Sequence, residues 1–176
     1  MSERISPFPF DLPYDLAAER AVIGSVLIDT ECYSAVSKIL SNDDFYSEFN
    51  REVWCAEGEC IRDGLLDFVT LEAKLRERGS LEKIGGIRYV LSVAQETPTS
   101  EGAIRYAEQV ENCGRRRRLL RGLTEACDAL ADMGSDVAEI SGYIQQALLV
   151  PNAEQKDTYT FGEAFEKWER EYQKRR

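Results

Sequence analysis

The chain has 176 residues, of which 43% are hydrophobic, and its 22 Lys and Arg against 32 Asp and Glu give a formal net charge of -10. This length and composition suit one globular domain of ordinary size and exclude a wholly disordered chain. The negative charge opposes general binding to nucleic acid or to anionic membranes. The sequence contains neither a signal-peptide pattern nor an apolar run of about 18 residues, so we expect a cytoplasmic protein.

The first predicted element is a buried helix from Asp15 to Asp29, with Pro13 and Asp15 as start signals. Only Glu19 and Arg20 carry charge inside it, and its apolar residues cover most of the helix circumference. Other helices should therefore surround it. Gly24 costs about 1 kcal/mol of helix propensity, which indicates that close packing selects this residue.

Short amphipathic helices are predicted as far as Pro98. Thr30 and Thr70 are the expected N-caps of two of them. Between these two, one helix face is predicted to carry Phe49, Val53, Ala56 and Cys60. The pair Gly85 and Gly86 follows no strand and fits neither common phosphate-loop spacing, so we interpret it as a turn.

The five cysteines and the absence of histidine argue against several kinds of site. An odd number of cysteines without a secretory signal does not suit a disulfide framework. Cys55 and Cys60 have no second cysteine pair with which to complete a zinc site. We therefore expect all five cysteines to be small buried hydrophobic residues, and we expect no metal or other cofactor in this chain.

From Ser100 to about Asp132 the pattern lengthens into a helix of about 30 residues, which is typical of a projecting hairpin. A second helix follows the short turn at 133–135, so the two helices should be antiparallel. Their apolar residues recur in heptads and are predicted to form an oligomer interface. The predicted interface residues are Cys113, Leu120, Leu123, Cys127, Leu130, Ile140 and Ile144.

A last helix is predicted over 160–176, after a polar linker at 151–159. Thr160 and Glu163 form its capping box. Four aromatic residues share one face of this helix and predict a surface that docks on a partner. These residues are Phe161, Phe165, Trp168 and Tyr172. The alternative is that this helix folds back on its own head.

Eight short motifs follow one another along the chain. They are A-A-E-R-A-V-I-G-S-V-L-I-D at 17–29, D-F-Y at 44–46, D-F-V-T at 67–70, L-x-x-x-G-x-L at 75–81, I-G-G-x-x-Y at 84–89, P-T at 98–99, Y-A at 106–107 and R-R-L-L at 117–120. In this order and at these spacings, the chain resembles the N-terminal domain and linker helix of hexameric replicative DNA helicases of the DnaB type. One departure is Asn50, where that family usually has a histidine after D-F-Y.

The resemblance implies an all-α fold with a globular head at 1–99 and a helical hairpin at 100–150, followed by the linker at 151–159 and the docking helix at 160–176. In that family the heads and hairpins pair into dimers and assemble into a collar, up to a hexamer, which docks primase and helicase loaders. The linker helix reaches an adjacent motor domain. ATP and Mg²⁺ belong to that motor, which is absent from this sequence, so we expect no catalytic or cofactor-binding residue in this chain alone.

Two other functions stay open at this point. A stand-alone adaptor or inhibitor could mimic the collar and cap a helicase or primase. Alternatively, five arginines could form a nucleic-acid patch: Arg115, Arg116, Arg117, Arg118 and Arg121. Consecutive helix positions step by about 100°, so these side chains ring the helix. The i, i+4 pairs Glu111 with Arg115 and Arg121 with Glu125 favour ion pairs instead, and we expect no direct DNA binding.

Overall fold

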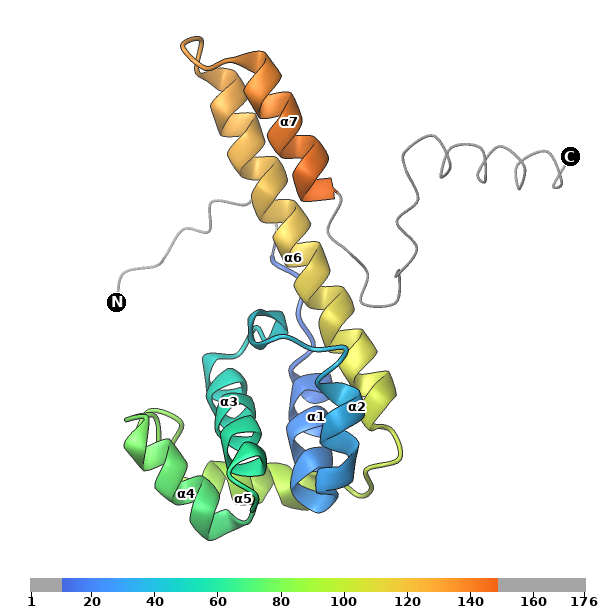
Figure 1. Ribbon diagram of the computed structural model, residues 1–176, viewed down its shortest axis with the longest axis vertical. Helices are drawn as coiled ribbons and strands as arrows, with labels where there is room; N and C mark the ends of the chain where they lie inside the picture. Colours follow the sequence, from blue (N-terminus) through green and yellow to red (C-terminus); the bar gives the residue numbers. More distant parts are fainter. Residues whose placement is uncertain (1–10, 149–176) are drawn as a thin grey trace, which may run out of the picture.

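In the computed structural model, which describes residues 11–148, helix α1 (Leu16–Ile28) lies inside the head (Figure 1). Asp15 caps this helix by accepting a hydrogen bond of 2.8 Å from the amide of Ala18. Three other helices pack against α1, namely α3 (Glu48–Arg62), α5 (Ile87–Glu96) and α6 (Ala103–Ala131). The prediction of a central buried helix is confirmed, although Leu16 and Ile28 at its two ends are exposed.

The close crossing of α1 and α5 explains the glycine at position 24. A Cβ atom on Gly24 would lie 2.0 Å from Oγ1 of Thr97 and 3.0 Å from the carbonyl oxygen of Val93. The Thr97 hydroxyl itself donates to that carbonyl oxygen over 2.9 Å, so it cannot move away without losing a buried hydrogen bond. Packing therefore selects Gly24, as predicted.

Two predicted N-caps are wrong, and both are replaced by an earlier aspartate. Asp29 accepts the first amide hydrogen bond of the turn that Thr30 was expected to cap. Asp67 accepts two amide hydrogen bonds of 2.9 and 2.7 Å at the start of α4 (Phe68–Glu77), while Thr70 accepts a reciprocal bond from the Asp67 amide. A carboxylate is a strong acceptor at a helix N-terminus, so it takes the capping position. The remaining elements of the head are η1 (Thr30–Cys32), α2 (Tyr33–Val36) and η2 (Asn42–Asp44).

The predicted apolar face of α3 is confirmed except at its first residue. Val53, Ala56 and Cys60 are buried, whereas Phe49 is 45% exposed. Phe49 lies in the first turn of the helix, where its ring meets the edge of Tyr89 at the head surface. The same helix also buries two polar side chains that the pattern did not indicate, Asn50 and Glu57.

All five cysteines are free thiols, and the prediction that all are buried is wrong. Cys60 is buried, Cys32, Cys55 and Cys113 are partly exposed, and Cys127 is exposed on the hairpin. Gly85 and Gly86 adopt φ angles of 89° and 78°, which confirms a turn in the left-handed region that favours glycine.

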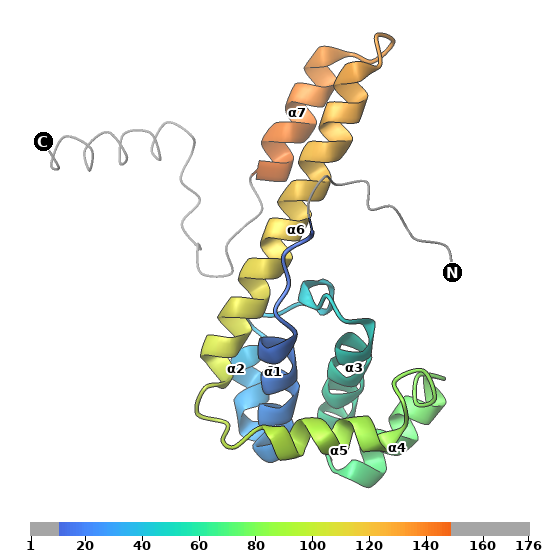
Figure 2. The same cartoon turned by 180° about the vertical axis from the view of Figure 1, so that it is seen from behind.

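The 29-residue helix α6 runs from the head to the tip of the hairpin, and α7 (Val137–Leu148) folds back along its outer half (Figures 1 and 2). Its first half packs against α1 and buries Ala103, Ala107 and Val110. Its outer half contacts α7 and buries the small residues Gly122 and Ala126. One continuous helix thus contributes to both the head core and the hairpin.

The all-α fold is confirmed, since no strand occurs in residues 11–148. In this described part, none of the helices is both long and apolar enough to cross a lipid bilayer. The predicted linker at 151–159 and the predicted docking helix at 160–176 lie outside the described residues. The four aromatic residues of that helix stay a prediction.

Candidate functional site

A buried carboxylate joins three parts of the head. Glu19 of α1 is 1% exposed and accepts hydrogen bonds from the amides of Tyr46, over 2.6 Å, and Ser47, over 3.2 Å. It also accepts a bond of 2.8 Å from the side-chain amide of Asn50, whose oxygen in turn accepts from the hydroxyl of Tyr89. Three donors therefore satisfy a charge that would be costly to bury alone.

Asn50 lies at the position where the resemblance leads us to expect histidine, and its side chain makes two hydrogen bonds. Its NH₂ group donates to Glu19 and its oxygen accepts from Tyr89. A neutral imidazole also offers one donor and one acceptor, so the asparagine can make the same pair of bonds. Unlike histidine, asparagine does not titrate near neutral pH, so the charge at this position does not change in that range.

Arg117 fastens the D-F-Y loop to α6. This guanidinium is 3% exposed, donates to the carbonyl oxygen of Pro13 over 2.8 Å and also donates to that of Asp44. It lies 5.6 Å from the centre of the Tyr46 ring. Burial lowers the pKa of Arg117 from its ordinary value. Arg118 forms an ion pair with the Asp44 carboxylate, so two adjacent arginines hold one loop.

Most of the five arginines at 115–118 and 121 make contacts within the fold. Arg115 pairs with Glu111 over 2.9 Å, as its spacing predicted, and Arg117 and Arg118 are engaged within the fold. The expected pair between Arg121 and Glu125 does not form in the described structure. Glu125 instead accepts a hydrogen bond of 2.6 Å from the hydroxyl of Tyr143 across the hairpin. Arg116 also donates to Asn112 over 2.8 Å, so four of the five arginines make intramolecular contacts, which does not favour a nucleic-acid patch.

The predicted oligomer-interface residues fall into two groups. Ile140 is buried inside the hairpin, and Cys113, Leu120 and Ile144 are partly buried. The other group is open to solvent: Leu123 is 44% exposed, Leu130 is 48% exposed, and Cys127 is also exposed. In the half of α6 that contacts α7, the buried residues are Gly122 and Ala126, which lie about 100° and 60° around the helix from Leu123. Three of the seven predicted interface residues are thus exposed to solvent in the described part of the chain.

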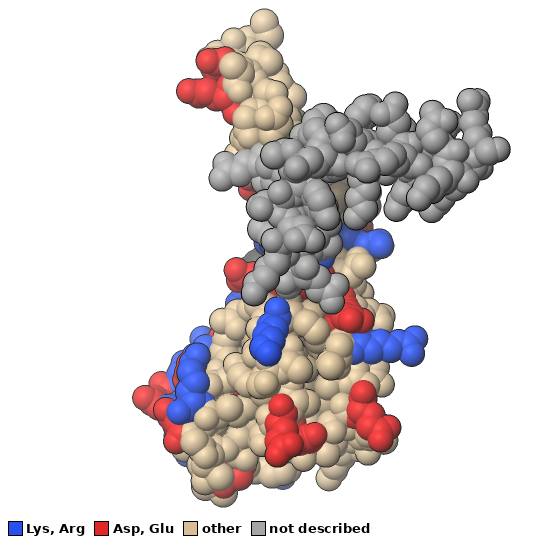
Figure 3. Space-filling view, turned by 45° about the vertical axis from the view of Figure 1, so that its right-hand side comes forward, with Lys and Arg blue, Asp and Glu red and all other residues tan. Residues whose placement is uncertain are grey.

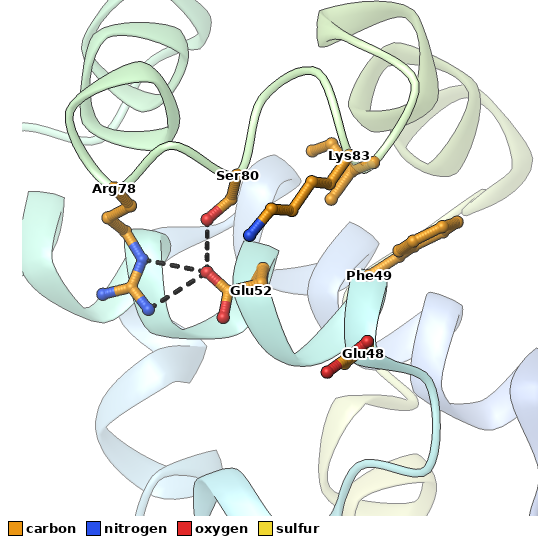
Figure 4. Close-up of a pocket in the computed structure, with 7 residues that line it drawn as sticks. Glu48, Phe49, Glu52, Arg78, Ser80 and Lys83 are labelled. Atoms are coloured by element: carbon orange, nitrogen blue, oxygen red, sulfur yellow. Dashed lines mark hydrogen bonds and ion pairs between the residues drawn. The ribbon is translucent and has the colours of Figure 1, made fainter.

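A polar pocket lies between the start of α3 and the turn after α4 (Figure 4). Arg78 donates to Glu52 over 3.1 and 3.2 Å and to Glu59 over 2.6 Å. Partial burial opposes ionisation of Glu52, but hydrogen bonds from Ser80 and Arg78 outweigh it and lower the pKa of this carboxyl group. Lys83 points toward the pocket from the turn (Figure 4). These contacts hold the turn against α3, and we assign no catalytic or binding role to the residues of this pocket.

Metal binding has no support in residues 11–148, where no group of three or more Cys, Asp or Glu side chains could hold a metal ion.

Comparison with known families agrees with this arrangement. The model of the DnaB-like helicase N terminal domain matches residues 11–112, more than half of the chain. The chain belongs to this DnaB family. Among its relatives, the replicative DNA helicase DnaB of Geobacillus stearothermophilus is 35% identical over 124 residues, which cover 70% of this chain and 26% of that protein. The replicative DNA helicase DnaC of Bacillus subtilis is 28% identical over 155 residues, or 85% of this chain and 33% of that protein. The chain therefore spans about a third or less of the length of these relatives.

Solved structures show the same relationship. The crystal structure of the N-terminal domain of DnaB helicase from Mycobacterium tuberculosis aligns with a TM-score of 0.74 and 32% identity, covering 79% of this chain and 99% of that one. A structure of a DnaB-like replicative helicase and its interactions with primase aligns with a TM-score of 0.63 over 88% of this chain and 35% of that one. Its 17% identity supports the fold alone.

The DnaB resemblance is thus confirmed, and the structure shows what some of its motifs do. Glu19, the D-F-Y loop, Tyr89 and Arg117 come from four separate motifs and meet in one hydrogen-bonded junction. Sequence reasoning missed this junction. The available signal was the carboxylate of Glu19 inside an otherwise apolar helix, because a charge at such a position needs partners from elsewhere in the chain.

Proposed function

We propose that this chain is the collar module of a replicative helicase, which self-associates and docks primase and a helicase loader during DNA replication in the cytoplasm. The observation that carries this proposal is the exposed apolar seam of Leu123, Cys127 and Leu130, which α7 leaves uncovered. Exposed apolar stripes on a projecting hairpin favour protein contacts. Membership of the DnaB family supports the same role.

The proposal assigns no catalytic role to the residues of this chain. ATP-driven unwinding and its Mg²⁺ would belong to a motor domain, to which the predicted helix at 160–176 would connect through its four aromatic residues. The second candidate is a stand-alone adaptor or inhibitor that binds helicase or primase through the same collar surface. Sequencing the gene beyond the codon for Arg176 separates the two, because only a helicase would continue into a G-x-x-x-x-G-K-[ST] motif.

The substitution Leu123→Asp tests self-association. It should abolish or greatly weaken dimers, at a cost of several kcal/mol, because a carboxylate would be buried without a partner in a packed interface. The fold itself should change little, since Leu123 is 44% exposed in the single chain. Ile104→Asp is a matched control, because Ile104 is 48% exposed on α6 but lies about 100° away from the seam. Sedimentation velocity measures both variants, and dimers of equal strength in the two would contradict the seam assignment.

Primase docking gives a second expected result. A chain with a formal charge of -10 should bind a primase domain with basic rim residues, with an affinity that falls as salt rises. Calorimetric titration of the assembled oligomer with the helicase-binding domain of primase measures this directly. If no heat and no co-elution are found at low salt, primase is not a partner and the adaptor hypothesis gains weight.

A further inference from the structure

The segment before α1 runs beside α6 toward the hairpin (Figures 1 and 2). Asp15 accepts a hydrogen bond from the side chain of Gln109. Two residues earlier, the carbonyl oxygen of Pro13 accepts a bond of 2.8 Å from Arg117, which is eight residues closer to the tip than Gln109. The path of the chain at Pro13 is therefore fixed by two contacts to α6, and it points to the outer half of this helix.

The exposed seam lies on the same side of α6 as this segment. Pro13 shares a pocket with Gln109 and Arg116 among others. Cys127 lies 18 residues after Gln109, which corresponds to about five full turns, so both residues face the same direction. Leu123 lies seven residues after Arg116 and is displaced from it by only about 20° around the helix. A chain that continued past Pro13 in the same direction would meet the seam.

Residues 1–10 lie outside the described part of the chain, and their sequence suits an apolar surface. Residues 5–10, which we call the arm, read I-S-P-F-P-F and carry no charge. Alternate side chains of an extended segment point to one side, so Phe8 and Phe10 would share a side with Leu12. Proline at the alternate positions restricts the backbone and lowers the entropy that docking costs.

The arm has the right length to cover the seam. Phe10 and Phe8 precede Pro13 by three and five residues, or about 10 and 17 Å of extended chain. Along α6, Leu123 and Cys127 lie six and ten residues beyond the arginine that binds Pro13, or about 9 and 15 Å. Each aromatic ring can therefore reach one residue of the seam.

Charge on the hairpin agrees with this occupant. Residues 122–148 contain five acidic residues and no Lys or Arg. Figure 3 shows acidic side chains on the outer end of the hairpin. Residues 4–10 contain one arginine and no acidic residue, so they meet no repulsion from like charges there.

We propose that the arm covers the seam of its own chain. Phe10 would pack on Leu123, and the ring of Phe8 would lie over the Cys127 thiol. A short tether keeps the arm near the seam at a millimolar effective concentration, so a second copy at micromolar concentration has to displace it. The arm is then an autoinhibitory cover that limits pairing of two chains. Only this last consequence rests on the proposed self-association.

Alkylation of Cys127 tests the cover on the full chain. The double variant Phe8→Ser/Phe10→Ser keeps the arm and removes both rings. Iodoacetamide should modify Cys127 at least about fivefold faster in this variant than in the natural chain, because reaction no longer requires the arm to open. Nanomolar protein prevents a second copy from covering the seam, and peptide mass spectrometry follows each cysteine separately.

Two controls accompany this measurement. Cys55 of α3 is a partly exposed thiol on the head, so its alkylation rate should be the same in all variants. Ile5→Ser is the matched arm variant, because Ile5 points to the opposite side of an extended chain from the two rings, and it should leave the Cys127 rate unchanged. Equal Cys127 rates in the natural chain and the double variant would overturn the proposal.

The predicted helix at 160–176 is the other possible cover of the seam. The variant Phe165→Ser/Trp168→Ser removes two of its aromatic residues. If this variant accelerates alkylation of Cys127 and the arm variant does not, the seam is covered by that helix and the proposal is wrong.

Dimer affinity measures the autoinhibitory effect. Phe8→Ser/Phe10→Ser should dimerise about tenfold more tightly than the natural chain in sedimentation equilibrium, because the arm no longer competes for the seam. Weaker dimers in this variant would mean that the arm binds the other copy, which would overturn a cover within one chain. A natural chain that stays monomeric at high micromolar concentration would overturn the proposed self-association, while the alkylation of Cys127 would still decide whether the arm covers the seam.

Discussion

Replacing Glu19 by methionine is expected to lower the free energy of unfolding by roughly 3 to 6 kcal/mol. The methionine fills a similar volume but leaves the amides of Tyr46 and Ser47 and the side chain of Asn50 without their acceptor. Each buried donor left unsatisfied costs about 1 to 3 kcal/mol. Such a loss is a large part of the stability of a typical domain, about 5 to 15 kcal/mol.

Urea unfolding followed by circular dichroism measures this change. Glu19→Gln should cost less, because its side-chain oxygen still accepts from some of these donors. Glu108→Met is the surface control, since Glu108 is exposed on α6, and its stability should stay within about 0.5 kcal/mol of the natural chain. A loss below about 1 kcal/mol for Glu19→Met would mean that the junction contributes little to the fold.

Replacing Glu57 by methionine is expected to have the opposite effect. Glu57 of α3 is completely buried, and neither of its carboxyl oxygens has a hydrogen-bond partner among residues 11–148. Burial raises the pKa of this carboxyl group well above its usual value of 4.5, so the folded chain favours the protonated form. An apolar side chain of similar length removes the unsatisfied group and should stabilise the head by roughly 1 to 3 kcal/mol at pH 7.

The same carboxyl group makes stability depend on pH. Below about pH 4.5 both the folded and the unfolded chain hold the Glu57 proton, and its contribution is fully present. At higher pH the unfolded chain releases the proton while the folded chain keeps it, so the free energy of unfolding falls by about 1.4 kcal/mol per pH unit. The fall ends once the pH passes the raised pKa of the folded state.

Urea titrations between pH 5 and pH 8 on the natural chain and on Glu57→Met give the test. The difference between the two unfolding free energies should widen as the pH rises. Glu48→Met is a control on the same helix, because Glu48 has a side chain that is 79% exposed, and its difference from the natural chain should not depend on pH in this range. A constant difference for Glu57→Met would show that Glu57 is ionised in the fold.

Much of this architecture is determined by the sequence alone. The helix from Leu16 to Ile28, the turn at Gly85 and Gly86, and the long helix with its antiparallel partner all follow from local patterns. Hydrophobic periodicity, glycine conformation and helix length act over a few turns, so they can be recognised without the rest of the fold. The DnaB motifs, read together, were also sufficient to predict the family.

Tertiary structure decided which polar residues enter the core and which apolar residues stay outside it. The polar residues Glu19, Asn50 and Arg117 can be buried because hydrogen-bond donors and acceptors from segments distant in the sequence lie next to them. A local sequence pattern does not reveal these partners. Leu123 and Leu130 belong to the same predicted interface as Ile140, yet the buried residues where α6 approaches α7 are Gly122 and Ala126, and these leucines stay exposed. Small residues permit that close approach, and the choice of helix face is a property of packing, which periodicity alone does not contain.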